Sequence, residues 1–432
     1  MSAELSQSPS TRGGGPLRPL SAADIEAAAQ RIAGVVMPTP LQPSDRLSAT
    51  TGASVYLKRE DLQTVRSYKL RGAYNLLVQL SPEELAAGVV CSSAGNHAQG
   101  FAYACRALGV RGRVYVPAKT PKQKRDRIRY HGGEFIELIV GGSTYDLAAE
   151  AALADVARTG ATLVPPFDDS RTMAGQGTIA VELLEQLDAE PDLVVVPVGG
   201  GGCIAGITTY LAERTTNTAV LGVEPAGAAA MMAALANGGP VTLEHVDQFV
   251  DGAAVSRAGR LTYAALAAAG DMVSITTVDE GAVCTAMLDL YQNEGIIAEP
   301  AGALAVAGLL ESGIEPGSTV VCLVSGGNND VSRYGEVLER SLVHLGLKHY
   351  FLVDFPQEPG ALRRFLDGVL GPQDDITLFE YVKRNNRETG EALVGIELGS
   401  AAGLDGLLER MRATEMQIET IEPGSPAYRY LL

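Results

Sequence analysis

Four short segments carry residue types that could bind a phosphate and activate an amine. They are residues 67–73 (SYKLRGA), 92–100 (SSAGNHAQG), 199–202 (GGGG) and 325–328 (SGGN). A lysine amine such as Lys69 becomes a nucleophile or a base when burial or a nearby positive charge lowers its pKa. The sequence therefore offers amine chemistry on Lys69, with glycine-rich loops available to hold an anionic group.

The four glycines at 199–202 predict a phosphate site at the start of a helix. Glycine tolerates unusual dihedral angles and close approach, so successive backbone amides can converge on one phosphate. Gly200, Gly202 and Ala205 also match the pattern G-x-G-x-x-A of dinucleotide-binding loops, with Glu224 about twenty residues later. From this segment alone three interpretations stay open: a dinucleotide, another phosphate-bearing cofactor, or a tight structural turn.

Taken together, the four segments resemble the threonine/serine dehydratase family of pyridoxal-phosphate enzymes. They occur in that family's order, and the resemblance covers residues 22–333. It implies an α/β protein of fold type II, similar to the β subunit of tryptophan synthase, with two three-layer subdomains and the smaller one at about residues 61–161. The motifs that strengthen it are residues 165–168 (PPFD), 175–178 (GQGT) and 299–303 (EPAGA).

The resemblance implies a set of cofactor contacts. Lys69 would carry pyridoxal 5'-phosphate as a Schiff base and act as the base at the substrate α-carbon, and Asn96 would hydrogen-bond the ring hydroxyl. Ser325 would face the pyridine nitrogen, where a neutral hydroxyl gives a weaker electron sink than a carboxylate and favours loss of a β-hydroxyl. The residues implied for the phosphate are Gly199, Gly200, Gly201, Gly202 and the amide of Cys203.

The substrate contacts implied by the resemblance lie in residues 92–100. The backbone of this loop would receive the substrate carboxylate, with the donor geometry of an anion-binding nest. Ala94 stands where related serine racemases have a serine that can protonate the second face, so racemisation is disfavoured. His97 opens a helix, and we expect a structural hydrogen bond there more than direct chemistry. The implied substrate-binding residues are Ser93, Ala94, Gly95 and His97.

Three other features lie outside these contacts. Glu299 is either near the cofactor edge or a helix N-terminal carboxylate favoured by the helix dipole. Some relatives place a divalent ion at a Glu after a strand and an Asp six residues later; here Glu224 is present but Ala230 replaces the Asp, so we expect no metal site. The basic run 119–129 has helical spacing and indicates a solvated helix face that helps to attract an anionic substrate.

The elements that must position these residues alternate between strand and helix, which is typical of βαβ units and parallel sheet. Ser21 is a good N-cap for a helix that runs to Ile32, and a second helix is expected at 145–158. The glycine-rich segments near Gly95 and Gly200 follow strands directly, where ligands bind in open α/β sheets. The expected strands are residues 89–91, 113–116, 134–140, 162–164, 193–198, 219–223 and 319–324.

The pattern changes near residue 345. A connecting helix at 334–348 leads into elements in the ferredoxin-like βαββαβ order. Residues 355–362 (FPQEPGAL) and 376–381 (ITLFEY) resemble the ACT-like regulatory domain of biosynthetic threonine dehydratases, in one copy at 345–432. This implies an allosteric effector site, although a role in assembly alone stays open. The expected elements are residues 350–355, 360–370, 376–383, 393–398, 404–412 and 417–421.

Composition and charge exclude several classes of protein. The chain has 432 residues, 46% of them hydrophobic and 20% charged, which is ordinary for a globular protein of several domains. Its net charge of −17 argues against nucleic acid or an anionic membrane as a partner. It has no long apolar stretch, no signal-peptide pattern and an odd number of cysteines, so we expect a cytoplasmic protein. Residues 1–19 are expected to form a disordered tail and residues 20–335 the catalytic domain.

The resemblance predicts dehydration and deamination of L-threonine to 2-oxobutanoate and ammonium, as the first step of isoleucine synthesis. It also implies a homotetramer, with isoleucine as inhibitor and valine opposing it. A serine dehydratase or serine racemase is the alternative. A nicotinamide-dependent oxidoreductase would leave residues 67–73 and 92–100 unexplained, and retention of Lys69 opposes an amino-acid-binding regulator that has lost catalysis.

Overall fold

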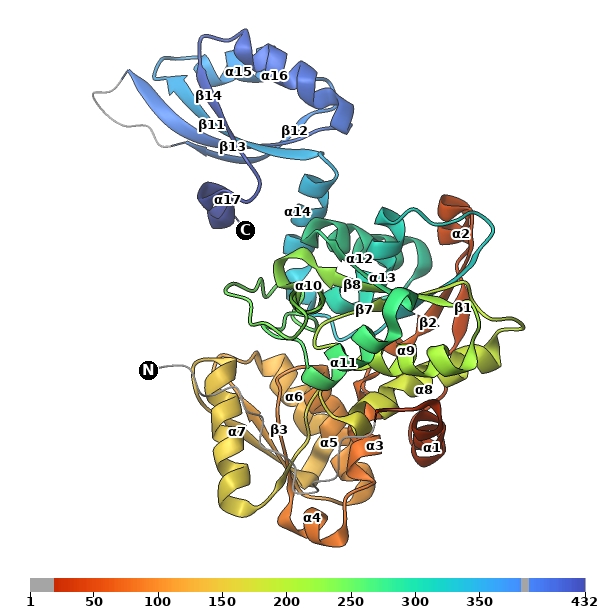
Figure 1. The fold of residues 1–432 in the computed structure, drawn as a ribbon. Helices are drawn as coiled ribbons and strands as arrows, with labels where there is room; N and C mark the ends of the chain where they lie inside the picture. The colour runs from red at the N-terminus through yellow and green to blue at the C-terminus, as the bar shows by residue number, and fades with distance from the viewer. Residues whose placement is uncertain (1–18, 382–387, 432) are drawn as a thin grey trace.

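The computed structural model describes residues 19–381 and 388–431, and three sheets organise this part of the chain. Two of the sheets, with their helices, form the body in the lower part of Figure 1, and the third lies above them at the end of helix α14 (Tyr334–His344). Residues 1–18 of the expected tail lie outside the described residues.

The largest sheet has six strands in the order β1-β2-β10-β7-β8-β9. Its neighbours pair in parallel except β1 with β2. Val320, Cys322 and Val324 face one hydrophobic core while Val321 and Leu323 face another, so helices cover both sides of the sheet. The strands are β1 Leu41–Pro43, β2 Ser54–Arg59, β7 Leu193–Pro197, β8 Ala219–Pro225, β9 Val273–Val278 and β10 Thr319–Val324.

A second, smaller sheet is entirely parallel, in the order β5-β4-β3-β6. Val89 and Cys91 pack toward helices α3, α5 and α6, whereas Val90 packs toward α7, which gives three layers. The strands are β3 Val89–Ser92, β4 Gly112–Val116, β5 Ile136–Val140 and β6 Thr162–Leu163.

The helices of these two layered bodies begin at several of the expected signals. Ser21 forms a capping box with Asp24 at the start of α1, and Gly95 precedes α5. The helices are α1 Ala22–Ile32, α2 Asp45–Thr51, α3 Lys69–Leu77, α4 Pro82–Ala87, α5 Asn96–Leu108, α6 Lys122–Gly132, α7 Tyr145–Thr159, α8 Ser170–Gln186, α9 Gly202–Arg214, α10 Ala230–Asn237, α11 Arg260–Ala269, α12 Glu280–Glu294 and α13 Pro300–Glu311.

The third sheet is antiparallel, in the order β12-β13-β11-β14, and its elements follow the expected βαββαβ order. Phe351, Val353 and Phe355 face helices α15 and α16, while Tyr350 packs on the other side against Tyr428 of α17. The elements are β11 Lys348–Pro356, α15 Ala361–Val369, β12 Asp375–Tyr381, β13 Thr389–Glu397, α16 Leu404–Arg412, β14 Gln417–Ile421 and α17 Pro426–Leu431.

The structure differs from the expected elements at several places. Strands β1, β2 and β9 and helix α17 were not expected, and residues 133–135 form a short 3-10 turn instead of the start of a strand. The end of the third regulatory-domain segment, residues 382–383, lies outside the described residues. A search of the helices in the described chain finds none long and apolar enough to cross a membrane.

Candidate active site

The lysine segment and the serine-glycine-glycine segment are paired through their backbones. Ser67 and Gly326 form an isolated antiparallel bridge, and the amide of Tyr68 donates to the carbonyl of Ser325 at 3.2 Å. The amide of Gly327 donates to the carbonyl of Arg66 at 2.9 Å. These contacts bring Lys69 to the end of β10, next to Ser325, from a position about 250 residues away in sequence.

Lys69 is the first residue of α3 and is partly buried. Its Nζ atom lies 3.4 Å from the carbonyl oxygen of Pro166 and 5.0 Å from the centroid of the Tyr68 ring. Burial lowers the pKa of the Lys69 amine to about 8, although the acidic groups of Cys203 and Glu299 oppose the shift. A substantial fraction of this amine is therefore neutral slightly above physiological pH, as a nucleophile or base requires.

Helix α3 is held in place by a buried ionic network. The Arg71 guanidinium donates to both carboxylate oxygens of Glu60, at 2.9 and 2.7 Å, and to Glu182 at 2.6 Å. Lys58 also donates to Glu182, at 2.6 Å. Burial alone would lower the pKa of Arg71, but the two carboxylates raise it, so Arg71 stays charged. Sequence reasoning included Arg71 in its motif but did not predict these partners.

The tetraglycine segment forms a loop without room for side chains. A Cβ on Gly200 would stand 2.3 Å from the Phe167 ring, and a Cβ on Gly199 would stand 2.9 Å from the Cα of Ala253. Gly201 has a φ of 90°, which glycine adopts without strain. The segment ends at the first residue of α9, where backbone amides have no partner within the helix.

A small cavity lies between this loop and Lys69. Thr262 stabilises the tetraglycine loop, since its hydroxyl donates to the carbonyl of Gly200 at 2.7 Å. The residues that line the cavity are Tyr68, Lys69, Phe167, Pro197, Gly199, Gly200, Gly201, Gly202, Cys203 and Gly252.

Asn96 lies in a chain of side-chain hydrogen bonds at the opposite side of the site. Its Nδ2 donates to Glu299, and its Oδ1 accepts from Nδ2 of Asn328 at 2.8 Å. Burial raises the pKa of Glu299 to about 7, and the charge of Asp251 adds to this effect, while the Asn96 hydrogen bond opposes it. Sequence analysis left two interpretations of Glu299 open; here it is the N-cap residue of α13 and also the partner of Asn96.

The residues expected to receive a carboxylate form the turn between β3 and α5. Ser93 accepts a hydrogen bond from the amide of Gly95 at 3.3 Å, and Ala94 packs against the core of the small sheet. His97 is buried, and its Nε2 lies 2.8 Å from the carbonyl of Val164. Burial lowers the pKa of His97 to about 4, so its imidazole is neutral at physiological pH. This agrees with the structural hydrogen bond expected from the sequence.

The remaining two expected cofactor residues also lie at this site. Cys203 is the second residue of α9 and is buried, and burial raises the pKa of its thiol to about 12, which opposes thiolate chemistry. The Ser325 hydroxyl donates to the carbonyl of Ala301 at 3.2 Å. The structure thus places Lys69, Asn96, the tetraglycine loop and Ser325 around one site.

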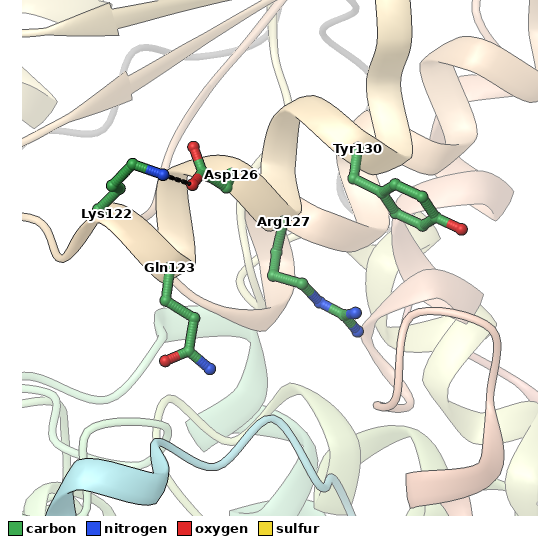
Figure 2. A pocket seen from close by; sticks show the side chains of 5 residues that line it. All are labelled: Lys122, Gln123, Asp126, Arg127 and Tyr130. Atoms are coloured by element: carbon green, nitrogen blue, oxygen red, sulfur yellow. Dashed lines mark hydrogen bonds and ion pairs between the residues drawn. The ribbon is translucent and has the colours of Figure 1, made fainter.

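Most of the basic run lies in helix α6, outside this site. Figure 2 shows Gln123 and Arg127 extending from α6 into an open hollow, with Lys122 paired to Asp126 and Tyr130 farther along the helix. Lys122, Gln123 and Tyr130 are exposed to solvent, in agreement with a solvated helix face. One residue of this helix reaches a different partner, because Lys124 forms an ion pair with Asp251 of the large subdomain.

Comparison with known proteins adds two family matches. Residues 32–326 match the family described as pyridoxal-phosphate-dependent enzyme, and residues 339–431 match the C-terminal regulatory domain of threonine dehydratase. The biosynthetic L-threonine dehydratase IlvA of Mycobacterium tuberculosis is 89% identical over 432 residues, covering 100% of both chains. The chain belongs to the biosynthetic L-threonine dehydratases. Its cofactor is therefore pyridoxal 5'-phosphate.

Solved structures of related enzymes are similar to this chain in fold. The processed form of threonine deaminase isoform 2 from Solanum lycopersicum is 37% identical, with a TM-score of 0.70, and the match covers 75% of this chain and 96% of that one. Maize serine racemase is 30% identical, with a TM-score of 0.69, and the match covers 76% and 99% of the two chains. The regulatory-domain match supports the threonine dehydratase over the racemase.

The residues of this dehydratase fit its cofactor. The cavity is bounded by glycines, which leave the backbone amides of the loop uncovered by side chains, and a Cβ on Gly199, Gly200 or Gly201 would collide with neighbouring residues. A lysine amine with a lowered pKa stands at the other side of the same cavity. The residues that would hold the cofactor are Lys69, Asn96, Gly199, Gly200, Gly201, Gly202, Cys203 and Ser325.

Proposed function

We propose that this chain converts L-threonine to 2-oxobutanoate and ammonium, with Lys69 as the catalytic base. The observation that carries the proposal is the lysine amine of lowered pKa at one cavity with the tetraglycine loop. When bound, pyridoxal 5'-phosphate supplies the electron sink that makes the α-proton of the amino acid acidic. With a pKa of about 8, the amine of Lys69 can accept that proton near neutral pH and release it again in a later step.

The other residues of the site bind and orient the substrate in this proposal. The turn of Ser93, Ala94, Gly95 and His97 presents backbone donors at the start of α5 to the substrate carboxylate. Ala94 offers no proton on the second face, which favours elimination over racemisation. Loss of the β-hydroxyl as water and hydrolysis of the released product then give 2-oxobutanoate and ammonium.

The proposal extends to regulation and assembly. Residues 345–432 would bind isoleucine as an inhibitor and valine as its antagonist, supported by the regulatory-domain match at 339–431. We expect a homotetramer that works in the cytoplasm. The five buried, unpaired cysteines support a reducing compartment.

Lys69 is tested by trapping the cofactor. The purified protein should absorb visible light, lose that band on treatment with borohydride, and carry a pyridoxyl group on Lys69 by peptide mass spectrometry. Lys69→Ala should lose at least about a thousandfold in threonine turnover, since both base and cofactor attachment are removed. Lys122→Ala, which removes one exposed lysine of the basic run, is the matched control and should retain most of its turnover.

A protein that stays colourless after incubation with pyridoxal phosphate would contradict the proposal, as would an active Lys69→Ala variant. Chiral analysis of recovered substrate separates the alternative. D-serine formed from L-serine at a rate comparable to 2-oxobutanoate formation would favour the racemase.

A further inference from the structure

Loop 249–253 is a wall of the cofactor cavity that sequence motifs did not identify. Gly252 lines the cavity beside Lys69, and Ala253 packs against the tetraglycine loop, where a Cβ on Gly199 would lie 2.9 Å from its Cα. Phe249, Val250 and Ala253 are buried. A displacement of this loop would therefore change the shape of the cofactor site.

The same loop also contacts the opposite side of the active site. Asp251 forms an ion pair with Lys124 of α6, in the smaller subdomain. A Cβ on Gly252 would stand 3.9 Å from Oε1 of Glu299, the carboxyl group that accepts from Asn96. The loop thus connects the tetraglycine loop, Glu299 and the smaller subdomain.

Two arginines at the start and in the middle of α14 hold this loop. The guanidinium carbons of Arg333 and Arg340 lie 4.5 and 4.3 Å from the centroid of the Phe249 ring. Arg333 also donates to the carbonyl of Phe249 at 2.9 Å. Glu336 fixes both guanidinium groups, at 3.0 Å from Arg340 and 3.8 Å from Arg333. Cation–π contacts to a buried ring are stronger than those at exposed sites.

The middle of α14 also contacts the first strand of the regulatory sheet, through Glu339, the residue before Arg340. Glu339 accepts a hydrogen bond from the Tyr350 hydroxyl at 2.5 Å and forms an ion pair with Lys348. On both sides of Glu339 and Arg340, α14 packs on α12: Val337 is fully buried, and Ser341 hydrogen-bonds Thr285 at 2.9 Å. Figure 1 shows α14 as the helix that joins the regulatory sheet to the catalytic body.

We propose that α14 couples the regulatory sheet to loop 249–253, with Arg333 and Arg340 acting as positioning residues for the cofactor site. A shift of β11 moves Glu339, and because α14 is one rigid helix, the shift reaches the two arginines and the Phe249 ring. The loop then changes its contact with the tetraglycine loop and with Lys124. The identity of the effector used below, isoleucine, rests on the proposed function; the link between α14 and the loop does not.

The test uses the full-length holoprotein in four variants: Arg340→Met, Phe249→Leu, the two combined, and Arg340→Lys. Arg214→Met is the matched control, because Arg214 lies over the ring of Tyr210 at 5.9 Å on a different helix. Three quantities are measured in each protein. They are isoleucine binding by calorimetry, the factor by which isoleucine raises the KM for threonine, and hydrogen exchange of the amides at 249–254.

In Arg340→Met and Phe249→Leu we expect isoleucine to bind within about twofold of wild type, while its effect on KM falls by about threefold or more. Because Phe249→Leu already removes the contact that Arg340→Met removes, the combined variant should lose no more coupling than Phe249→Leu alone. Exchange at 249–254 should become faster by about threefold or more. Arg340→Lys, which keeps the cation, should recover most of the wild-type behaviour, and Arg214→Met should match wild type throughout.

Unchanged coupling and unchanged exchange in folded Arg340→Met and Phe249→Leu would overturn the inference, as would additive losses in the combined variant. Loss of isoleucine binding in Arg340→Met would also overturn it, because α14 would then belong to the effector site. If isoleucine has no effect on the wild-type protein, the proposed effector is wrong. The exchange measurement, which needs no effector, still decides whether Arg340 holds the loop.

Discussion

The protonation of the Glu299 carboxyl bears on the orientation of the Asn96 side chain in the candidate active site. Asn328 donates to Oδ1 of Asn96, so Nδ2 of Asn96 is the atom directed to Glu299. Burial raises the pKa of Glu299 to about 7, which places its titration in the physiological range. The orientation of the Asn96 amide, the predicted partner of the cofactor's ring hydroxyl, therefore depends on a group that exchanges its proton near neutral pH.

Glu299→Gln should change how stability depends on pH. The native carboxyl keeps its proton up to a pH of about 7, whereas the unfolded one loses it near its ordinary value of 4.5. The native protein therefore binds more protons in this window, and stability falls as pH rises, by at most about 1.4 kcal/mol per pH unit. Urea unfolding at pH 5, 6, 7 and 8 should show the variant gaining stability relative to wild type as pH rises, with the gain levelling above pH 7.

Parallel stability curves for the two proteins would contradict a raised pKa at Glu299. Asp271→Asn, at an exposed acid on another surface, serves as a control for the loss of one negative charge. Its curve should follow the wild-type curve, because the substitution removes a negative charge at an exposed position and leaves the buried Glu299 in place.

At the residue scale, the sequence predicted the types of group at the site better than their contacts. Lys69, Asn96, the glycines and Ser325 occur in ordered motifs, and the fold brings them together. The partner of Asn96 could not be predicted, because 203 residues separate it from Glu299. A hydrogen bond over that separation depends on how two subdomains pack, and no local spacing reports it.

At the scale of elements, the position of Lys69 depends on how α3 is anchored. Arg71 follows it by two residues and is fully buried between Glu60, at the end of β2, and Glu182 of α8. A buried ion pair adds little compared with an apolar substitute, but removal of one partner leaves an uncompensated buried charge. Loss of the Arg71 side chain should therefore destabilise α3 by more than the net free energy that its ion pairs contribute.

Arg71→Met should destabilise the protein by about 3–5 kcal/mol, because Glu60 would remain buried without its cation and Glu182 would keep only Lys58. Chemical unfolding of the holoprotein measures this loss. Adding Glu60→Gln to Arg71→Met should restore part of it, since the double variant buries one charge fewer. Arg158→Met, at an exposed arginine that also pairs with an aspartate, should change stability little. A small loss in Arg71→Met would mean that water reaches the carboxylates.

The elements that sequence reasoning missed share a polar appearance. Strand β2 (SVYLKR) contains Lys58 and Arg59, which look like solvent-facing residues, yet both are buried by pairing with Glu182 and Asp61. Strand β9 (VSITTV) is rich in hydroxyl residues and lies at the edge of the sheet, so it lacks the continuous apolar run of a central strand. Central strands such as β7 and β10 were predicted because they are buried on both faces.

At the scale of the whole molecule, one helix carries the junction between the catalytic body and the regulatory sheet. The catalytic side of α14 is anchored by Val337, which is buried in the large core. Its last turn contributes Val343 to a small cluster with Tyr350, Ile421 and Tyr428 of the regulatory domain. Because α14 packs on α12 through residues before 345, the catalytic core does not need the regulatory sheet to complete it.

A chain that ends at Leu345 should therefore keep threonine turnover within about threefold of the full-length protein and lose its inhibition by isoleucine. The cut preserves all of α14, with Arg340 and the preceding Arg333, and removes most of residues 339–431, the segment that matches a regulatory domain. Steady-state kinetics with and without isoleucine measure both effects. Valine, which is expected to oppose isoleucine, should have no effect on the shortened chain.

The shortened chain exposes Val343 and leaves Glu339 without Tyr350 and Lys348, so Val343→Ser should be introduced to keep the protein soluble. The same substitution in the full-length chain is the control for its own effect on turnover. Inhibition by isoleucine that survives the cut would place the effector site in the catalytic body, and the regulatory sheet would then serve assembly alone. Loss of turnover with retained cofactor absorbance would instead mean that the sheet holds α14, and through it loop 249–253, in the active arrangement.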